Sequence, residues 1–353
     1  MRVRLPAEFT IAGRPVGQFH PTYVIAEVGA NHNRDLAMAR ALIDEAVEAG
    51  VDAVKFQTYS GHRIYTAQTP RFQYLEGVSD KSPAELLDEI ALPREWQGKL
   101  AAYAADRGIH FFSTPFDNDA VAELAALDVP VLKIASFEII DLPLIRRAAA
   151  TGCPLIVSTG MASLGEVEDA LAAAAEGGAP AVGLMQCTSL YPAPPESVNL
   201  RAMETMRRVF GVPVGLSDHT LGITVPVAAA ALGAAFVEKH FTLDRTARGP
   251  DHPFALEPIE LARMVEGIRM VEQALGDGRK DGPSEAEREE MYVLARRSLV
   301  VTRDVPKGTV LTPELVTTKR PGYGIPPKHL DIVLGRAVSR DVHEDEVLTW
   351  DMV

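Results

Sequence analysis

The sequence is poor in cysteine and tryptophan and has no long apolar run. Its 353 residues include 2 cysteines, Cys153 and Cys187, and 2 tryptophans. Two cysteines in a chain of this length do not form a disulfide framework, so we expect buried thiols in a reducing cytosol. No segment approaches the ~18 consecutive apolar residues of a membrane-spanning helix, and the N-terminus lacks the apolar core of a signal peptide. The sequence therefore predicts a cytoplasmic protein with no membrane partner.

Basic charge is also scarce. The chain has 35 Lys and Arg against 48 Asp and Glu, which gives a net charge of −13. This acidity argues against a nucleic-acid partner or an anionic membrane surface. The 47% apolar content and the mean hydropathy of +0.03 are typical of a globular protein with an ample core, which excludes a mostly disordered chain.

Short β-type runs alternate with Ala-rich helical stretches through the first three quarters of the chain. The runs begin at Tyr23, Ala53, His110, Val131, Pro154, Val182, Pro213 and Ala235, and a closing helix is expected near residues 261–275. Eight such units favour a TIM (β/α)8 barrel over an open doubly wound sheet. The longer connection from Ser60 to Glu95 is expected to be an irregular loop that contributes substrate contacts.

The composition changes after Leu275. Residues 277–294 are polar, charged and Gly-bearing, and they are expected to form a linker after a barrel of residues 1–276. Residues 295–353 contain short Val, Leu and Thr runs punctuated by Pro and Gly, which predicts a small β-rich domain. A domain of this size is expected to dock against another surface.

Polar residues occur at the ends of all eight predicted strands, where a TIM barrel carries its active site. A single one could merely cap the next helix, but eight in succession predict a site. The residues are Glu27, Asn31, Lys55, Gln57, Ser113, Thr114, Asp117, Lys133, Ser136, Ser158, Thr159, Thr188, Ser189, Tyr191, Ser217, Asp218, His219, Glu238 and His240.

Two histidines, His219 and His240, end consecutive predicted strands. Imidazoles that converge there indicate a divalent metal, and a pair of hydrogen-bonded core histidines is the alternative. Residues two apart on a strand share a face, so Glu238 points the same way as His240. Lys239 is then expected to point outward among the helices.

Lys55 and Lys133 each follow an apolar β-type run, and a buried ammonium needs a partner. The pair predicts a bound anion, with internal pairing to Glu27, Glu238 or Asp218 as the alternative. Hydroxyl groups near these lysines would allow a phosphate and a carboxylate to be held together. These hydroxyls belong to Ser136, Ser158, Ser189 and Ser217.

Motifs along nearly the whole chain, in the right order, resemble the sialic acid synthase family. They are AEVGANHN, VKFQTY, FSTPFD, LKIAS, STGM, QCTSLYPAPPESVNL, GLSDHTLG and EKHFTLDRTARGPDH. The C-terminal segments RRSLVV and KRPGYGI resemble the antifreeze-like (SAF) domain that follows the barrel in that family. The resemblance implies an enzyme that condenses phosphoenolpyruvate with N-acetylmannosamine or a related 2-acetamido sugar and releases phosphate.

The resemblance also implies roles for individual residues. His219 and His240 match the ligands of a divalent cation, usually manganese, with magnesium or cobalt as alternatives. Glu27 matches a glutamate that contacts the acceptor sugar near its reacting carbon, and Tyr191 and Asp251 match sugar contacts. Arg320 matches an arginine that the SAF domain places over the partner's barrel in a domain-swapped homodimer. The positions that match phosphoenolpyruvate contacts are Lys55, Thr114, Lys133, Ser136, Ser158, Ser189 and Ser217.

The chain departs from the family pattern at several positions. Some bacterial members have asparagine at Ser189 and histidine at Gln186. The segment Pro253 to Ala255 replaces small and hydroxyl residues, and Tyr323 stands where asparagine is frequent. These changes leave the acceptor open among N-acetylmannosamine, its 6-phosphate and a 2,4-diacetamido-trideoxy sugar of the legionaminic or pseudaminic pathways.

Two other functions compete with this interpretation. A Schiff-base aldolase could use Lys55 or Lys133 on pyruvate, but it would leave the histidine pair without a role. A non-catalytic ice-binding module would need a flat, repeated Thr surface, which the C-terminal segment lacks, and it would leave the eight polar strand ends unexplained.

Overall fold

The computed structural model describes residues 5–70 and 81–353 of the chain. These residues form two compact units, Met1–Gly276 and Asp277–Val353, which are described separately. Within the described residues, no helix combines the length and the apolar character needed to cross a bilayer.

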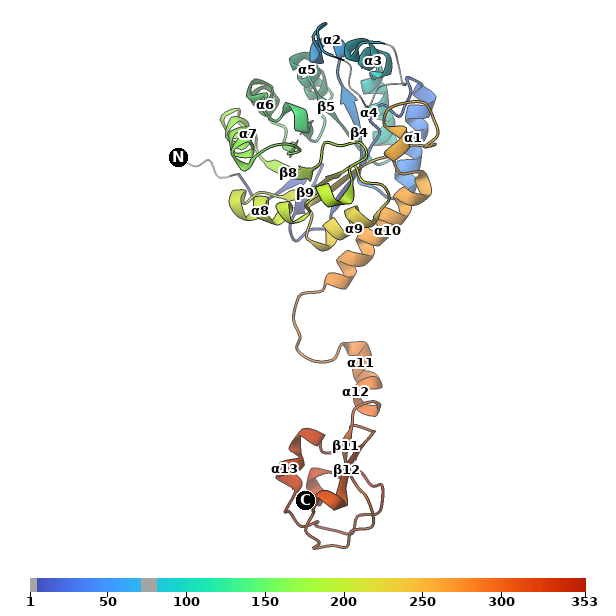
Figure 1. Ribbon diagram of the computed structural model, residues 1–353, viewed down its shortest axis with the longest axis vertical. Helices are drawn as coiled ribbons and strands as arrows, with labels where there is room; N and C mark the ends of the chain where they lie inside the picture. The colour runs from blue at the N-terminus through green and yellow to red at the C-terminus, as the bar shows by residue number, and fades with distance from the viewer. Residues whose placement is uncertain (1–4, 71–80) are drawn as a thin grey trace. The chain divides into compact units, whose positions relative to one another are not determined.

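The first unit is a nearly closed barrel of eight parallel strands (Figure 1). The strands are hydrogen-bonded in the order β5-β4-β3-β10-β9-β8-β7-β6, and β5 and β6, at the ends of this order, contact each other. The predicted TIM barrel is therefore confirmed, and each predicted run contains one strand. The strands are β3 (Tyr23–Glu27), β4 (Ala53–Thr58), β5 (His110–Pro115), β6 (Leu132–Ile134), β7 (Leu155–Ser158), β8 (Val182–Cys187), β9 (Val214–Asp218) and β10 (Phe236–His240).

Helices surround the strands in Figure 1 and bury their apolar faces on them. Local sequence sets where they begin: Asp35 accepts from the N–H groups of Ala37 and Met38 at the start of α1, and Ser163 and Glu166 form a capping box at the start of α7. The helices are α1 (Leu36–Glu48), α4 (Gln97–Asp106), α5 (Asn118–Ala126), α6 (Leu142–Ala149), α7 (Leu164–Glu176), α8 (Arg201–Phe210), α9 (Thr224–Ala231) and the closing α10 (Pro258–Leu275).

The connection from Ser60 to Glu95 is more regular than the sequence suggested. It contains α2 (Gly61–Ile64) and α3 (Pro83–Ile90), while residues 71–80 lie outside the described residues. Ser82 and Glu85 form a capping box that starts α3, and Asp88 of α3 accepts hydrogen bonds from Ser60 and from the Gly61 N–H. The expectation of an irregular loop is therefore wrong for this part of the connection.

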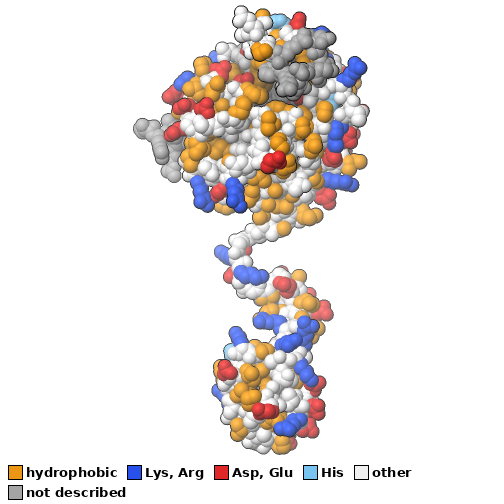
Figure 2. Space-filling model, viewed as in Figure 1, with side chains coloured by type: hydrophobic (Ala, Val, Ile, Leu, Met, Phe, Trp, Pro, Cys, Tyr) orange, Lys and Arg blue, Asp and Glu red, His pale blue; other side chains and the backbone are white. Residues whose placement is uncertain are grey.

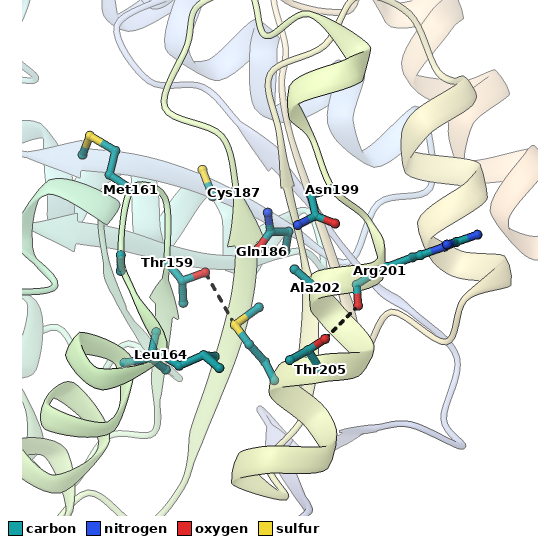
Figure 3. Close-up of a pocket in the computed structure, with 12 residues that line it drawn as sticks. Thr159, Met161, Leu164, Gln186, Cys187, Asn199, Arg201, Ala202 and Thr205 are labelled. Atoms are coloured by element: carbon teal, nitrogen blue, oxygen red, sulfur yellow. Dashed lines mark hydrogen bonds between the residues drawn. The ribbon is translucent and has the colours of Figure 1, made fainter.

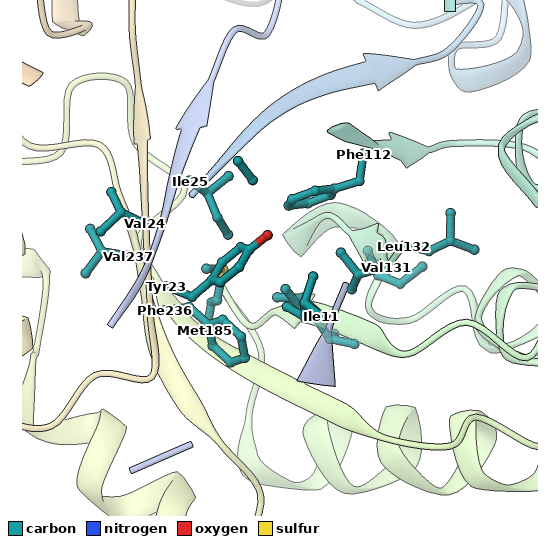
Figure 4. Close-up of a cluster of buried hydrophobic side chains, with 14 of the residues drawn as sticks. Ile11, Tyr23, Val24, Ile25, Phe112, Val131, Leu132, Met185, Phe236 and Val237 are labelled. Carbon is teal, nitrogen blue, oxygen red and sulfur yellow. The ribbon is translucent and has the colours of Figure 1, made fainter. Parts of the chain in front are cut away.

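A hairpin that the sequence analysis did not predict packs at the N-terminal ends of the barrel strands. It consists of β1 (Glu8–Ile11) and β2 (Arg14–Gly17), joined by Ala12 and Gly13, which both have positive φ as a tight two-residue turn requires. Ile11 is fully buried among strand residues such as Tyr23 and Phe236 (Figure 4). The hairpin therefore seals that end of the barrel with apolar side chains.

The second unit is small but has a hydrophobic core of its own. It contains α11 (Glu285–Glu289) and α12 (Met291–Leu294) within the predicted linker, followed by the antiparallel pair β11 (Ser298–Val301) and β12 (Val316–Lys319) and by α13 (Leu330–Val333). Isolated bridges such as Val305 with Val342 extend the β structure. The buried side chains include Leu299, Val301, Leu311, Ile325, Val333 and Leu348.

Candidate active site

Strand register brings the predicted polar residues together at the C-terminal mouth of the barrel. Glu27 of β3 pairs in register with Lys55 of β4 on one side and with His240 of β10 on the other, and Glu238 pairs with Ser217 of β9. Alternation along each strand directs these side chains inward. The mouth is therefore lined by charged groups that are almost fully buried.

Four charged side chains form an ionic cluster inside the mouth. The Lys55 ammonium lies 2.6 Å from Glu27 Oε2 and 3.7 Å from Glu238 Oε1, and the Lys133 ammonium lies 3.5 Å from Glu238 Oε2. Lys55 also donates to Thr114 Oγ1 at 3.1 Å. Both lysines thus have the internal carboxylate partners that the sequence analysis named as the alternative, and these partners are Glu27 and Glu238.

Burial opposes every charge in this cluster, and the neighbours decide the net shift in each pKa. Burial lowers the pKa of Lys133 below its ordinary value, whereas for Lys55 the carboxylates of Glu238 and Glu27 outweigh burial and raise the pKa. Burial raises the pKa of Glu27, although Lys55 opposes the shift. A bound anion would supply Lys133 with the countercharge that favours its ammonium form.

The hydroxyls of Ser136 and Ser189 approach the same glycine, Gly160, and Ser158 ends the strand that leads to it. The Gly160 N–H donates to Ser136 Oγ at 3.0 Å, and a Cβ atom at Gly160 would lie only 2.4 Å from Ser189 Oγ and 2.8 Å from Ser136 Oγ. The Oγ atoms of Ser158 and Ser189 are buried with no hydrogen-bond partner in the described part of the chain. Buried hydroxyls without partners are costly, so this corner suits an anion with several acceptor oxygens.

The two predicted metal-ligating histidines face each other at the mouth, with ring centroids 5.4 Å apart. His219 Nδ1 bonds the Thr188 carbonyl oxygen at 2.9 Å, which orients the ring and leaves Nε2 available. Burial and the nearby positive groups hold the pKa of His240 well below its ordinary value, and its buried Nδ1 has no hydrogen-bond partner within the described residues. For His219, burial is outweighed by Cys187 and the Thr188 carbonyl, which raise its pKa. The neutral His240 imidazole and the Nε2 atom of His219 are nitrogens that a divalent cation could bind.

The described residues contain no group of three or more His, Cys, Asp or Glu side chains that could hold a metal ion. A cation held by the histidine pair would have to take its other ligands from water or substrate.

Asp251 reaches the same mouth from the loop after β10. Its Oδ2 lies 3.7 Å from His240 Nδ1 and accepts from the Ala30 N–H at 3.4 Å. A Cβ atom at Gly29, where φ is +52°, would lie 2.7 Å from Asp251 Oδ2, so only glycine allows this approach. The neighbouring His252 forms a hydrogen bond through Nδ1 to Thr242 Oγ1, so its role here is to hold the loop in place.

Two aromatic side chains, Tyr191 and Phe254, pack against the histidines at the mouth. The Tyr191 ring lies 4.3 Å from the His219 ring, and the Phe254 ring lies 4.9 Å from the His240 ring, both measured between centroids. Gln57 donates to Glu27 Oε1 at 2.7 Å. Gln57 was recognised from the sequence only as a polar strand end. Glu238 was also placed on the face of His240 and named as a possible partner of the lysines.

Two predicted residues lie elsewhere. Asp218 binds the Lys239 ammonium at 2.6 Å on the opposite face of β9 and β10, which confirms that Lys239 points away from His240. Arg320 is an exposed residue of the second unit. Three further strand-end residues make structural contacts: Ser113 with Thr58, Asp117 as the N-cap of α5, and Thr159 with the Met185 carbonyl oxygen.

A separate cavity of about 350 Å³ lies beside the mouth, between the segments that lead into α7 and α8 (Figure 3). Thr159, Gln186 and Met206 line it, and Thr159 and Gln186 bond to the Met185 and Val198 carbonyl oxygens. The Arg201 side chain extends away from Gln186 in Figure 3. Its lining thus offers no converging charged groups comparable to those of the mouth.

The fold and the mouth together define a barrel protein with a candidate anion site beside a candidate metal site. Residues 42–280 match the NeuB family and residues 296–353 match the SAF domain. The chain therefore belongs to the NeuB family, whose enzymes condense phosphoenolpyruvate with amino-sugar substrates.

Named relatives cover nearly the whole chain. The N,N'-diacetyllegionaminic acid synthase of Campylobacter jejuni is 39% identical over 93% of this chain and 98% of its own length. The human N-acetylneuraminate-9-phosphate synthase is 35% identical over 99% and 98%. The crystal structure of the N-acetylneuraminic acid synthetase of Leptospira borgpetersenii is 34% identical and superposes with a TM-score of 0.73, covering 82% of this chain and 96% of that chain.

Proposed function

We propose that this protein condenses phosphoenolpyruvate with an N-acetylmannosamine-type 2-acetamido sugar to give a nine-carbon 2-keto-3-deoxy acid and phosphate. The observation that carries the proposal is the meeting of two buried lysines and two histidines at one barrel mouth with serine hydroxyls that have no hydrogen-bond partner among the described residues. A 2,4-diacetamido-trideoxyhexose, as the name of the Campylobacter relative suggests, is the alternative acceptor.

The proposed reaction consumes one water. Carbon 3 of phosphoenolpyruvate forms a bond to the aldehyde carbon of the open-chain sugar, and the aldehyde oxygen takes up a proton to become a hydroxyl group. Water adds to carbon 2 of the former phosphoenolpyruvate and gives up its protons as the carbon–oxygen bond to phosphate breaks. The products are a ketone at that carbon and inorganic phosphate.

Lys55 and Lys133 would hold the two anionic groups of phosphoenolpyruvate, and the hydroxyls of Ser158 and Ser189 would complete the contacts to its oxygens. Fixed charges in a buried site act by orienting the reactant and by stabilising charge as it develops. Because Glu238 already lies beside both lysines, the site is neutralised while no substrate is bound.

His219 and His240 would hold a divalent cation, for which we propose manganese. Such a cation supplies Lewis-acid polarisation of a carbonyl oxygen. Glu27, next in register to His240 and bonded to Gln57, would hold an acceptor hydroxyl or carry a proton near the aldehyde oxygen. Tyr191 and Asp251 would contact the sugar from the surrounding loops.

The test is phosphate release from phosphoenolpyruvate over a panel of acceptors: N-acetylmannosamine, its 6-phosphate and 2,4-diacetamido-trideoxyhexoses. Phosphoenolpyruvate labelled with ¹⁸O in the bridging position should transfer the label to phosphate, because the carbon–oxygen bond breaks. Release of unlabelled phosphate, or no release with any acceptor, would overturn the proposal.

One observation favours the Schiff-base aldolase as a second candidate. Burial lowers the pKa of Lys133, and a nucleophilic lysine needs such a shift. Borohydride treatment in the presence of pyruvate separates the two reactions. A covalent adduct on Lys133 supports the aldolase, and an unmodified chain that still consumes phosphoenolpyruvate supports condensation.

We further propose a domain-swapped homodimer in which Arg320 reaches the partner's barrel. Exposed apolar side chains on both units support this, because surfaces of this kind mark interfaces (Figure 2). On the loops after the barrel strands they are Phe137, Ile140, Met161, Leu190 and Leu221, and in the second unit they are Met291, Tyr292, Val293 and Leu294.

Subunit mixing tests the swap. A heterodimer of one Arg320→Ala chain and one His219→Ala chain is isolated with two affinity tags. If the domains are swapped, the barrel of the Arg320→Ala chain keeps its His219 and faces the intact Arg320 of the other chain. About half of its sites should then be active. The control heterodimer joins the double variant to the wild type and should be inactive. Activity in the control alone would show that Arg320 acts within its own chain.

A further inference from the structure

Phe254 places a carbon ring against both histidines in a mouth that is otherwise polar. The residue ends the short turn His252–Phe254 after β10 and is 3% exposed. Its ring centroid lies 4.9 Å from that of His240, 5.6 Å from that of Tyr191 and 6.2 Å from that of His219. Of these four rings, only that of Phe254 lacks a hydrogen-bonding atom.

The turn that carries Phe254 is firmly held. His252 bonds Thr242 at 2.7 Å on one ring nitrogen and Asn33 at 3.2 Å on the other. On the other side, the Leu256 N–H donates to the His240 carbonyl oxygen at 2.9 Å. Phe254 is therefore fixed to the strand that carries His240 and cannot easily move aside for a larger ligand.

The position of Phe254 relates it to one part of the acceptor. In the proposed reaction, the aldehyde carbon of the sugar lies beside the two histidines. Carbon 2 is bonded directly to this reacting carbon and carries the acylamino group. The acylamino group is therefore a substituent on the carbon next to the reacting carbon. A ring in contact with His240 would then lie beside the acyl group.

We infer that Phe254 forms the wall of the acyl-group pocket and limits the substituent on carbon 2 to an acetyl group. The inference rests on the proposed function. The acetyl methyl group packs on the ring face, and each added methylene would have to displace a buried ring in a closely packed interior.

The test compares two acceptors that differ only in acyl length, N-acetylmannosamine and N-butanoylmannosamine. If the wild type uses a diacetamido sugar instead, the test compares the forms of that sugar that carry an N-acetyl or an N-butanoyl group at carbon 2. The readout is the ratio of their kcat/KM values, because a loss of stability lowers both values alike. The wild type should prefer the acetyl form by about 10- to 100-fold, the range for added methylenes in an apolar pocket. Phe254→Ala should reduce this preference at least about tenfold, with an unchanged KM for phosphoenolpyruvate.

Two further variants keep the test decisive. Phe254→Leu retains an apolar side chain and should relax the preference partly, which answers the question even if the alanine variant fails to fold. Phe9→Ala removes a ring that packs on Phe236 with centroids 6.1 Å apart, at the sealed end of the barrel, and should leave the preference unchanged.

Three outcomes would count against the inference. An unchanged acetyl preference in Phe254→Ala and Phe254→Leu would overturn it. An equal loss with both acceptors, together with weaker manganese binding, would make Phe254 a positioning residue for His240 instead. Failure of the wild type to release phosphate with any acceptor would refute the proposed function itself, and this result is visible before any variant is made.

Discussion

The two ends of the barrel are equally buried but differ in chemistry. At the sealed end, Ile11, Tyr23 and Phe236 are fully buried, and at the mouth Lys55 and Glu27 are 3% and 1% exposed. Burying an apolar side chain stabilises the fold, whereas burying a charge costs free energy unless a partner compensates it. The mouth therefore concentrates buried charges where the core of the sealed end is apolar, and such a concentration of charges is typical of a binding site.

The polar groups of the two ends also differ in how they are satisfied. Near the sealed end, Tyr23 Oη pairs with His110 Nδ1 at 2.7 Å, and Asp52 pairs with both Arg14 and Arg269. At the mouth, Ser158, Ser189 and His240 have buried atoms without hydrogen-bond partners in the described chain. A ligand would satisfy these atoms, so the mouth is organised for a bound state and the sealed end for stability.

The largest expected effect comes from the histidine pair. His240→Ala should lower kcat by about 10³-fold or more and abolish manganese binding measured by calorimetry, because one of two protein ligands is lost. Chelation of the wild type should have the same effect, with recovery on adding manganese. Full activity after exhaustive chelation would contradict the metal assignment, and the unfolding temperature of the variant serves as the control for folding.

A matched change at the sealed end should affect stability instead. Ile11→Ala removes a fully buried side chain and should lower the free energy of unfolding by about 2–5 kcal/mol. The kcat of the folded fraction should not change, because Ile11 lies at the opposite end of the barrel. A loss of kcat that exceeds the unfolded fraction would disprove this separation of the two ends.

Lys133 links charge at the mouth to one substrate. Lys133→Ala should raise the KM for phosphoenolpyruvate by about 100-fold and leave the KM for the sugar nearly unchanged, because a charge-assisted contact to an anion is lost. Lys55→Ala should behave alike, with a larger loss of stability because Glu27 loses a partner at 2.6 Å. A selective rise in the KM for the sugar would place the anion elsewhere.

The sequence predicted the barrel better than it predicted the ends of the barrel. Alternating strands and helices have clear periods, so all eight strands were recognised. The β1–β2 hairpin has two strands of 4 residues each with mixed exposure, too short for a period to emerge. The start of α3 carried a readable signal, since Ser82 and Glu85 are three residues apart before an apolar run, but the length of the connection suggested a loop.

The polar residues of the site were predicted, but the carboxylate that pairs with each lysine was left open among Glu27, Glu238 and Asp218. Strand ends reveal which residues reach the mouth, whereas the pairing of Lys55 with both Glu27 and Glu238 depends on the register between strands and on side-chain length. Phe254 lies in a loop without periodicity, so the sequence marked it only as a departure from the family pattern. Its contact with the histidines depends on how the loop folds back.

The smallest expected effect concerns Glu138, whose burial should also cost free energy when the carboxyl group ionises. The residue follows β6, and its buried Oε2 atom has no hydrogen-bond partner among the described residues. Burial raises the pKa of Glu138 to about 7. In the unfolded chain this carboxyl ionises near pH 4.5, so between pH 4.5 and 7 the folded state binds more protons than the unfolded state.

The contribution of Glu138 to the free energy of unfolding must then fall as the pH rises through this window, by about 3 kcal/mol for a shift of this size. Glu138→Gln removes the ionisation, so the variant should gain on the wild type between pH 4.5 and 8, as measured by urea unfolding at both pH values. Glu168→Gln, an exposed glutamate on α7, is the matched control and should follow the wild type. Parallel pH profiles for the wild type and Glu138→Gln would mean that Glu138 ionises without cost. The contrast between the mouth and the sealed end would then depend only on the serine hydroxyls and His240, whose buried atoms lack hydrogen-bond partners in the described chain.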